Sequence, residues 1–265
     1  FDKMLTGYGF SLFNILAVRH EPSHKREMVN QALFGEPFEI IDEHEEWSKI
    51  RLAHDGYIGW VLNQQIQKIT SDEYRQLIDI PQYLVSDTLD LLEHHSPSKT
   101  RTVVAGSQLP FYNTEEKTIK VGIQIFTFRG RTSLRKRTRE ELLMNAYLYS
   151  NAPYLWGGRS AFGIDCSGLT QMAYLLTGMS LLRDASQQAT QGKTIDFLEE
   201  AKAGDLLFFD NEEGVITHVG IYVRENRILH ASGSVRIDGI DQTGIYNSEQ
   251  GKHTHKLRLI KNYFD

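Results

Sequence analysis

The chain has 265 residues, 40% of them hydrophobic, which is enough apolar material for two or three small domains with cores of their own. Its 29 Lys and Arg residues against 34 Asp and Glu residues give a net charge of −5. This balance excludes the basic surface that a nucleic-acid-binding or anionic-membrane-binding protein needs, so we predict no nucleic-acid partner.

The first 70 residues predict a small all-β domain. Apolar, β-branched and aromatic residues concentrate near 10–18, 36–42, 47–53 and 57–62, with turn-forming residues between them. The stretch "EWSKIRLAHDGYIGWV" contains an Asp-Gly turn followed by a Gly-Tyr-x-Gly-Trp-Val strand. It resembles the end of a bacterial SH3-type barrel, and we expect residues 1–70 to form one.

The next segment, residues 71–135, is harder to interpret. A helix is predicted to begin in "SDEYRQLID", and strands are predicted near 101–112 and 118–128. A second SH3-like barrel is the simplest interpretation. The dense positive run "RGRTSLRKRTR" at 129–139 is typical of a solvated linker that leads into a helix.

The stretch "HEPSH", residues 20–24, has the His-Glu-x-x-His pattern of zinc hydrolases. That pattern holds zinc only when both histidines lie on one helical face, and Pro22 opposes a helix here. Strand-like flanks agree, so we predict no metal at this site. Two other histidine pairs, His94-His95 and His253-x-His255, lack accompanying ligands and are expected at the solvent-exposed surface.

From residue 136 to 265 the pattern is α+β. The segment "TREELLMNAYLYSNAP" predicts a helix that begins after Thr138, and "DCSGLTQMAYLLTG" predicts a second helix that ends near Gly178. Four strand-like stretches follow: "GDLLFF", "HVGIYV", "RILHAS" and "HKLRLI". Helices first and a sheet afterwards is an α+β layout.

Cys166, the single cysteine, stands where the loop "GGRSAFGID" meets the second helix. It excludes an intramolecular disulfide, and it is either a buried apolar side chain or a nucleophile. A helix N-terminus favours the thiolate through the helix dipole and unpaired backbone N–H groups. We therefore expect a lowered pKa for the Cys166 thiol.

Two histidines favour the nucleophile. His218 and His230 lie on successive predicted strands joined by a short turn at 224–226. That turn places His230 opposite Gly220, so His218 and His230 become diagonal neighbours on one sheet face. A nucleophile, a base and a group that orients the base form the logic of a catalytic triad.

These motifs, "YLWGGRSAFGIDCSGLTQMAY", "AKAGDLLFF", "THVGIYV" and "ILHASG", resemble the NlpC-type, papain-like cell-wall peptidases over about residues 138–265. The resemblance implies that Cys166 is the nucleophile, His218 the general base and His230 the residue that orients it. It also implies that Tyr154 helps to stabilise the oxyanion. No cofactor is expected.

The SH3-type barrel narrows the resemblance to γ-D-glutamyl-L-diamino acid endopeptidases of peptidoglycan, which require a free N-terminal L-Ala and release L-Ala-γ-D-Glu. The substrate-binding residues that this implies are Glu21, Tyr57, Trp156, Asp165, Ser167, Arg183 and Asp184. Relatives often have Arg-Asp-Ser at the positions where this chain has Arg-Asp-Ala, so the serine hydroxyl is missing at Ala185. Ser186 or Ser167 would have to hold the D-Glu carboxylate in its place.

Several alternatives remain open at this stage. The fold also suits a non-catalytic cell-wall-binding protein, or an amidase or acyltransferase. A wall substrate implies the periplasm or cell envelope after removal of a leader, whereas a recycling enzyme would be cytoplasmic. The diamino acid can be diaminopimelate or Lys. We expect a monomer, and no stretch reaches the roughly 18 apolar residues of a transmembrane segment.

Overall fold

The structure is a computed structural model that describes residues 5–79, 83–133 and 135–264. The chain divides into two compact units, Phe1–Ser133 and Leu134–Asp265. Among the described residues, no helix is long and apolar enough to cross a membrane.

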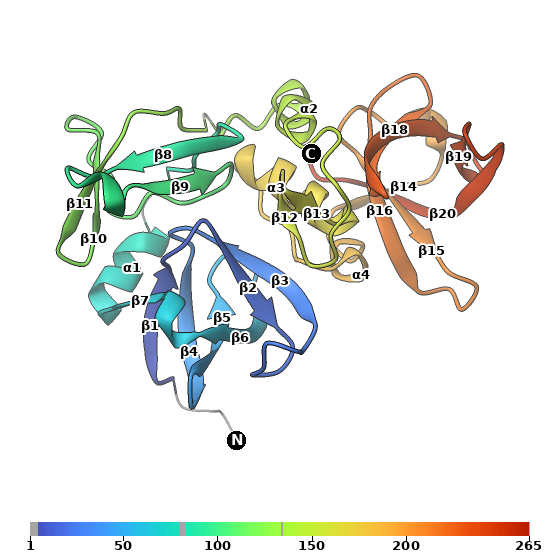
Figure 1. The fold of residues 1–265 in the computed structure, drawn as a ribbon. Coiled ribbons are helices and arrows are strands. Elements are labelled where there is room, and N and C mark those ends of the chain that lie inside the picture. The colour runs from blue at the N-terminus through green and yellow to red at the C-terminus, as the bar shows by residue number, and fades with distance from the viewer. Residues whose placement is uncertain (1–4, 80–82, 134, 265) are drawn as a thin grey trace. The chain divides into compact units, whose positions relative to one another are not determined.

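The amino-terminal unit begins with an antiparallel sheet in the order β3-β2-β6-β5-β4-β1-β7 (Figure 1). Its strands and the short 3-10 helix η1 are β1 Gly7–Ser11, β2 Ile15–Arg19, β3 Met28–Leu33, β4 Pro37–His44, β5 Trp47–Leu52, β6 Ile58–Leu62, η1 Asn63–Gln65 and β7 Ile66–Ile69. Alternate residues such as Leu16 and Val18 in β2 point inward, where they meet Phe38, Ile50 and Val61 in one core.

Gly59 explains part of the motif that closes this sheet. A Cβ at Gly59 would lie 2.4 Å from the side chain of Val18, because β6 packs closely on β2. Only glycine fits there without moving a buried neighbour.

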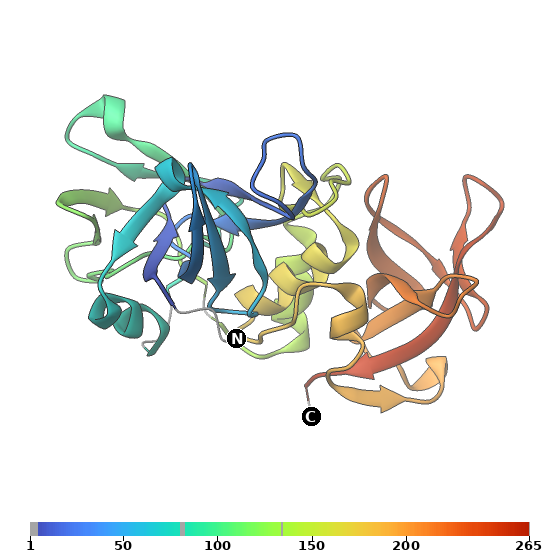
Figure 2. The same cartoon turned by 90° about the horizontal axis from the view of Figure 1, so that it is seen from below.

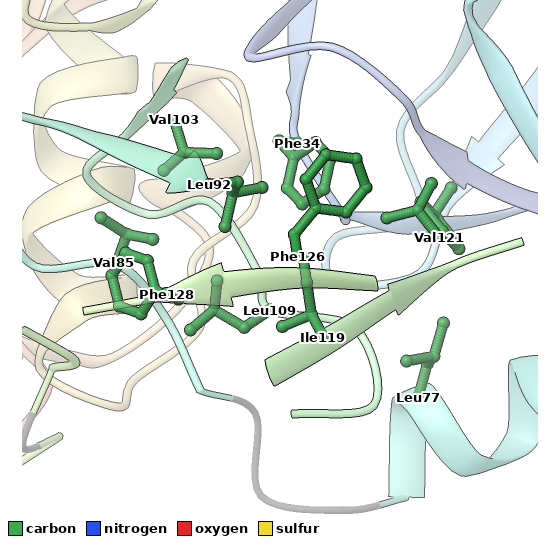
Figure 3. Close-up of a cluster of buried hydrophobic side chains, with 11 residues drawn as sticks. Phe34, Leu77, Val85, Leu92, Val103, Leu109, Ile119, Val121, Phe126 and Phe128 are labelled. Atoms are coloured by element: carbon green, nitrogen blue, oxygen red, sulfur yellow. The ribbon is translucent and has the colours of Figure 1, made fainter. Parts of the chain in front are cut away.

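A helix and a second, four-stranded sheet complete the amino-terminal unit. The sheet has the order β10-β11-β8-β9. The elements are α1 Ser71–Asp79, β8 Leu89–Glu93, η2 Pro97–Lys99, β9 Arg101–Val104, β10 Thr118–Val121 and β11 Gln124–Phe128. Its core contains Phe126 and Phe128 from the sheet, Leu77 from α1, and Phe10 and Phe34 from the first part of the chain (Figure 3). The second sheet therefore shares its core with the segment before residue 70.

Three predicted strands have different bounds in the structure. The strand expected at 10–18 is two strands, because Ser11 Oγ donates to the Phe13 carbonyl and Asn14 Oδ1 accepts from Ile15 N–H, which turns the chain. The strand expected at 101–112 ends at Val104. The strand expected at 118–128 is a hairpin that turns at Gly122, whose φ is +57°. Local turn chemistry decided all three.

The carboxy-terminal unit places helices beside a sheet, as Figures 1 and 2 show. Its elements are α2 Arg139–Tyr147, β12 Arg159–Ser160, β13 Gly163–Ile164, α3 Cys166–Leu176, α4 Ala185–Gln188, β14 Lys193–Ile195, η3 Leu198–Glu200, β15 Leu206–Asp210, β16 Ile216–Tyr222, β17 Arg227–Ser232, β18 Ser234–Ile240, β19 Gly244–Asn247 and β20 Lys252–Asn262. Both predicted helices are confirmed, and Thr138 caps α2 by accepting from Glu141 N–H. Residues 135–138 lead into α2 without regular structure, and residue 134 of the expected linker lies outside the described residues.

The sheet of this unit has the order β14-β20-β15-β16-β17-β18-β19, and β20 pairs with β19 as well. The six strands from β15 to β20 therefore close on themselves. The helix α3 packs against β16 and β17, which lie in the middle of this sheet. This packing brings the start of α3 to the strands that carry His218 and His230.

Candidate active site

Cys166 is the first residue of α3 and only 6% exposed. The helix fits tightly here, since a Cβ at Gly168 would lie 2.3 Å from the Gly158 carbonyl oxygen. Burial, followed by the charge of Asp165, raises the pKa of the Cys166 thiol to about 12. Backbone hydrogen bonds from Val219 and Ser167 favour the thiolate but do not offset burial. The expected lowering of this pKa is wrong, because desolvation outweighs the helix terminus, and the thiol needs a base.

The two histidines have the predicted geometry. His230 lies opposite Gly220 in the β16–β17 pair, and Val223 N–H donates to the Arg227 carbonyl across the turn. His218 Nε2 lies 2.9 Å from His230 Nδ1, and both rings are buried. Burial, then the neighbouring rings of His255 and His230, holds the pKa of His218 well below its usual value. His218 is therefore a neutral imidazole at neutral pH, as a general base must be.

The backbone hydrogen bond from Val219 to the thiol places the sulfur next to β16, one residue beyond His218. Nucleophile, base and orienting histidine thus meet where α3 packs against the sheet. Both predicted relationships, Cys166 at a helix start and two histidines on one face, hold in the structure.

Asp238 on β18 was not among the residues predicted from the sequence. Its Oδ2 lies 2.9 Å from His230 Nε2, and its side chain is 3% exposed. The signal was available, because His230 pairs with Arg236 and Asp238 is the next residue on that face. The same diagonal rule that joined His218 to His230 would have found it.

The expectation that His255 is solvent-exposed is wrong. Its ring is partly buried and stacks on His218, with centroids 4.1 Å apart and planes at 25°. Burial, then the neighbouring ring of His230, lowers the pKa of His255 to about 4. Only the pairing of β20 at the sheet's closure brings His255 here, and no local pattern predicts that contact. Its neighbour His253 is exposed and pairs with Asp241 at 2.8 Å.

Tyr154 and Trp156 lie in the loop before β12. Tyr154 N–H donates to the Gly233 carbonyl, which fixes the loop at the start of β18. Burial, followed by the charges of Cys166 and Asp165, raises the pKa of Tyr154 to about 12. Its hydroxyl therefore keeps its proton and can donate a hydrogen bond near the sulfur. Trp156 and Phe162, in the same segment of the chain, are 56% and 57% exposed.

Three of the expected substrate-binding residues form a buried network under the nucleophile. Arg183 donates from Nη1 to Asp165 Oδ1 at 3.0 Å and from Nη2 to Asp165 Oδ2 at 2.7 Å. Arg183 Nη1 also donates to Ser167 Oγ at 2.9 Å. Asp165 in turn caps α3 by accepting from Gly168 N–H at 2.7 Å, and from Gly157 N–H at 2.8 Å. These contacts fix the residues on either side of Cys166.

Asp184 is the N-cap of α4, where its backbone N–H donates to Gln187 Oε1 at 3.0 Å. Ala185 is buried, whereas Ser186 is exposed. Since Ser167 Oγ already accepts from Arg183, Ser186 is the more accessible of the two hydroxyls.

Glu21 and Tyr57 belong to the amino-terminal unit. Residues 20–27 form a loop between β2 and β3 rather than a helix, as Pro22 predicted. Glu21 pairs with Arg26 at 2.9 Å, and Tyr57 is partly buried just before β6. Because Arg19 pairs with Trp60 in antiparallel register, this loop and Tyr57 lie at the same end of the barrel. Among the described residues, no three His, Cys, Asp or Glu side chains gather as a metal site.

Comparison with known families matches two segments. Residues 151–258 match the NlpC/P60 family, and residues 18–66 match the bacterial dipeptidyl-peptidase SH3 domain. Cys166, His218 and His230 all fall in the first segment, and Glu21 and Tyr57 in the second.

Similar proteins extend over most of the chain. A γ-D-glutamyl-L-lysine dipeptidyl-peptidase of Bacillus subtilis is 33% identical over 83% of this chain and 78% of its own. A dipeptidyl-peptidase 6 of Lysinibacillus sphaericus is 30% identical over 84% of this chain and 88% of its own. The crystal structure of an NlpC/P60 family protein from Bacillus cereus, 20% identical, superposes with a TM-score of 0.82 over 97% of this chain and 100% of that one.

Proposed function

Since the chain belongs to the NlpC/P60 cysteine peptidases that carry a bacterial dipeptidyl-peptidase SH3 domain, we propose that it hydrolyses the γ-D-Glu-L-diamino acid bond of peptidoglycan stem peptides. Diaminopimelate and Lys are the candidate diamino acids, and the relative from Bacillus subtilis is named for Lys. The released product is L-Ala-γ-D-Glu.

One observation carries the proposal. A buried neutral imidazole, His218, is hydrogen-bonded to a second histidine and immediately precedes the residue whose backbone N–H reaches the Cys166 sulfur. Because the thiol keeps its proton at neutral pH, attack requires a base at this place.

The chemistry follows from these groups. The Cys166 sulfur attacks the D-Glu γ-carbonyl carbon while His218 takes the thiol proton. Donors from the Cys166 backbone N–H and the Tyr154 hydroxyl stabilise the oxyanion. His218 then gives its proton to the leaving amine, and water, deprotonated by His218, hydrolyses the thioester.

Selection of the substrate end rests on charge. A free L-Ala ammonium that enters a closed pocket must exchange its water for carboxylate or phenol oxygens. In the amino-terminal unit we assign that role to Glu21 and Tyr57. In the carboxy-terminal unit we assign polar contacts with the peptide to Asp184 and apolar contacts to Trp156. The position of Cys166 is fixed by Arg183, Asp165 and Ser167, which act on the substrate through it. We assign the hydrogen bond to the D-Glu carboxylate to the Ser186 hydroxyl.

The finer architecture and setting belong to the same proposal. We infer that the sheet β8–β11 is a second SH3-like barrel that depends on the first for its core. We also propose that the protein is a monomer and that it acts in the periplasm or cell envelope, with cytoplasmic recycling of wall fragments as the alternative.

The experiment is product analysis by mass spectrometry with L-Ala-γ-D-Glu-L-Lys, its diaminopimelate counterpart and the N-acetylated form of each. We expect L-Ala-γ-D-Glu from the free-amine peptides alone, no product with Cys166→Ala, and a raised KM with Glu21→Gln at unchanged rate of Cys166 alkylation. Equal hydrolysis of the acetylated peptides would refute the proposed recognition of the free amine. Binding without cutting would favour a wall-binding protein, and transfer to an added amine would favour an acyltransferase.

A further inference from the structure

Asp238 extends the row of buried groups beyond the two histidines. The carboxylate lies 2.9 Å from His230 Nε2, and His230 Nδ1 lies 2.9 Å from His218 Nε2. The side chains of His230 and Asp238 are 1% and 3% exposed, so water does not compete for these contacts. Both ring nitrogens of His230 and the Nε2 atom of His218 therefore each have one defined partner.

Asp238 is held as a carboxylate by Arg236. The guanidinium donates to both oxygens, from Nε to Oδ2 at 2.9 Å and from Nη2 to Oδ1 at 3.0 Å, and it also reaches Glu249 at 3.1 Å. Burial alone would raise the pKa of Asp238, but the hydrogen bonds from His230 and Arg236 together hold this pKa below its usual value. The Arg236 guanidinium therefore supplies Asp238 with a counter-charge that does not depend on His230.

The positions of the protons follow in order. An ionised carboxylate only accepts, so His230 Nε2 carries the proton that it donates to Asp238. A neutral imidazole has one N–H and one bare nitrogen, so His230 Nδ1 accepts from His218 Nε2. The bare nitrogen of His218 is then Nδ1, which is the atom that can receive a proton.

We propose that Asp238 is a positioning residue that, through His230, fixes the neutral form of His218 with its proton on Nε2 and its lone pair on Nδ1. The thiol proton of Cys166 then moves to Nδ1, while the Nε2 proton stays in its hydrogen bond to His230. If residue 238 could not accept a hydrogen bond, the His230 proton could move from Nε2 to Nδ1. His218 would then accept at Nε2 and present an N–H group, at Nδ1, to the thiol. The protonation pattern proposed here does not depend on the proposed function; only its role in peptide hydrolysis does.

The first test needs no substrate. Long-range ¹H–¹⁵N correlation spectra of the full chain at neutral pH report which ring nitrogen of each histidine is protonated. We expect His218 and His230 to be protonated on Nε2 and bare on Nδ1. A proton on Nδ1 of neutral His218, or a doubly protonated His230, would overturn the proposal whether or not any variant folds.

The second test uses Asp238→Asn, whose amide can donate to His230 Nε2. Replacing the aspartate of the serine-protease triad by asparagine lowers kcat roughly 10⁴-fold. Because a histidine stands between Asp238 and the base here, we expect a smaller loss of kcat, about 10²-fold, with KM changed by no more than about twofold. Asp238→Glu keeps the carboxylate and should recover part of the loss. Asp241→Asn is the matched control, because it breaks an exposed Asp–His pair of similar length.

Changed spectra together with the loss of kcat would support the proposal, and a loss of kcat with unchanged protonation of His218 would refute it. The rate of Cys166 alkylation by iodoacetamide provides a readout without peptide, and it should fall in Asp238→Asn. If the wild-type chain cuts no γ-D-Glu peptide, the proposed function fails while the spectra and alkylation rates still decide the role of Asp238.

Discussion

The buried pair of Arg183 and Asp165 leads to a measurable prediction about what positions the nucleophile. The two side chains are 1% and 7% exposed, and the guanidinium meets both carboxylate oxygens. Arg183→Met keeps most of the volume but leaves a buried carboxylate without its counter-charge. Breaking a buried pair in this way costs about 3–5 kcal/mol.

The assay is amide hydrogen exchange in α3, since the capping bond from Gly168 N–H to Asp165 belongs to this helix. A loss of about 3–5 kcal/mol corresponds to roughly 10²- to 4 × 10³-fold faster exchange through unfolding of the carboxy-terminal unit. The double variant Arg183→Met with Asp165→Asn removes the stranded charge and should regain at least about 1 kcal/mol.

Arg137→Met is the matched control in the same unit, because Arg137 is exposed and donates to the Gly178 carbonyl. We expect it to change stability by no more than about 1 kcal/mol. If Arg183→Met costs less than about 1 kcal/mol but raises KM, Arg183 faces the substrate rather than Asp165, and the reasoning is refuted.

Three further outcomes are expected. Tyr154→Phe should lower kcat by roughly 10- to 10³-fold with little change in KM, as loss of an oxyanion donor does, whereas exposed Tyr246→Phe should leave both unchanged. The depressed pKa of His255 means that the unfolded chain binds the proton first, so stability falls as pH drops below about 6.5 towards about 4. His255→Gln should flatten the pH dependence of Tm in that window, and an unaltered slope would contradict this origin. Phe34 lies in the core shared by both sheets of the amino-terminal unit, so Phe34→Ala should lower the free energy of unfolding by about 3–5 kcal/mol. Amide hydrogen exchange should then become faster in β8–β11 and in β1–β7 together. Faster exchange in one sheet alone would show that the two sheets unfold independently.

The sequence alone determined the elements whose signals are local. The start of α3 at Cys166 follows from the N-cap Asp165, and the diagonal of His218 and His230 follows from strand alternation across a short turn. Residues of the amino-terminal barrel were recognisable because Gly59 and its neighbours meet a steric demand that few residues satisfy. Where side chains turned the chain early, as at Ser11 and Asn14, the predicted strand bounds were wrong.

Only the tertiary structure decided the electrostatics of the site and the contacts between distant segments. The pKa of Cys166 depends on how much water the packed sheet removes, and a motif at a helix terminus carries no information about that. The stacking of His255 on His218 arises because β20 closes the sheet from the far end of the chain. Arg183 is buried against Asp165, 18 residues earlier in the chain. In each case the charge and exposure of a side chain are set by its neighbours in space, which are not its neighbours in sequence.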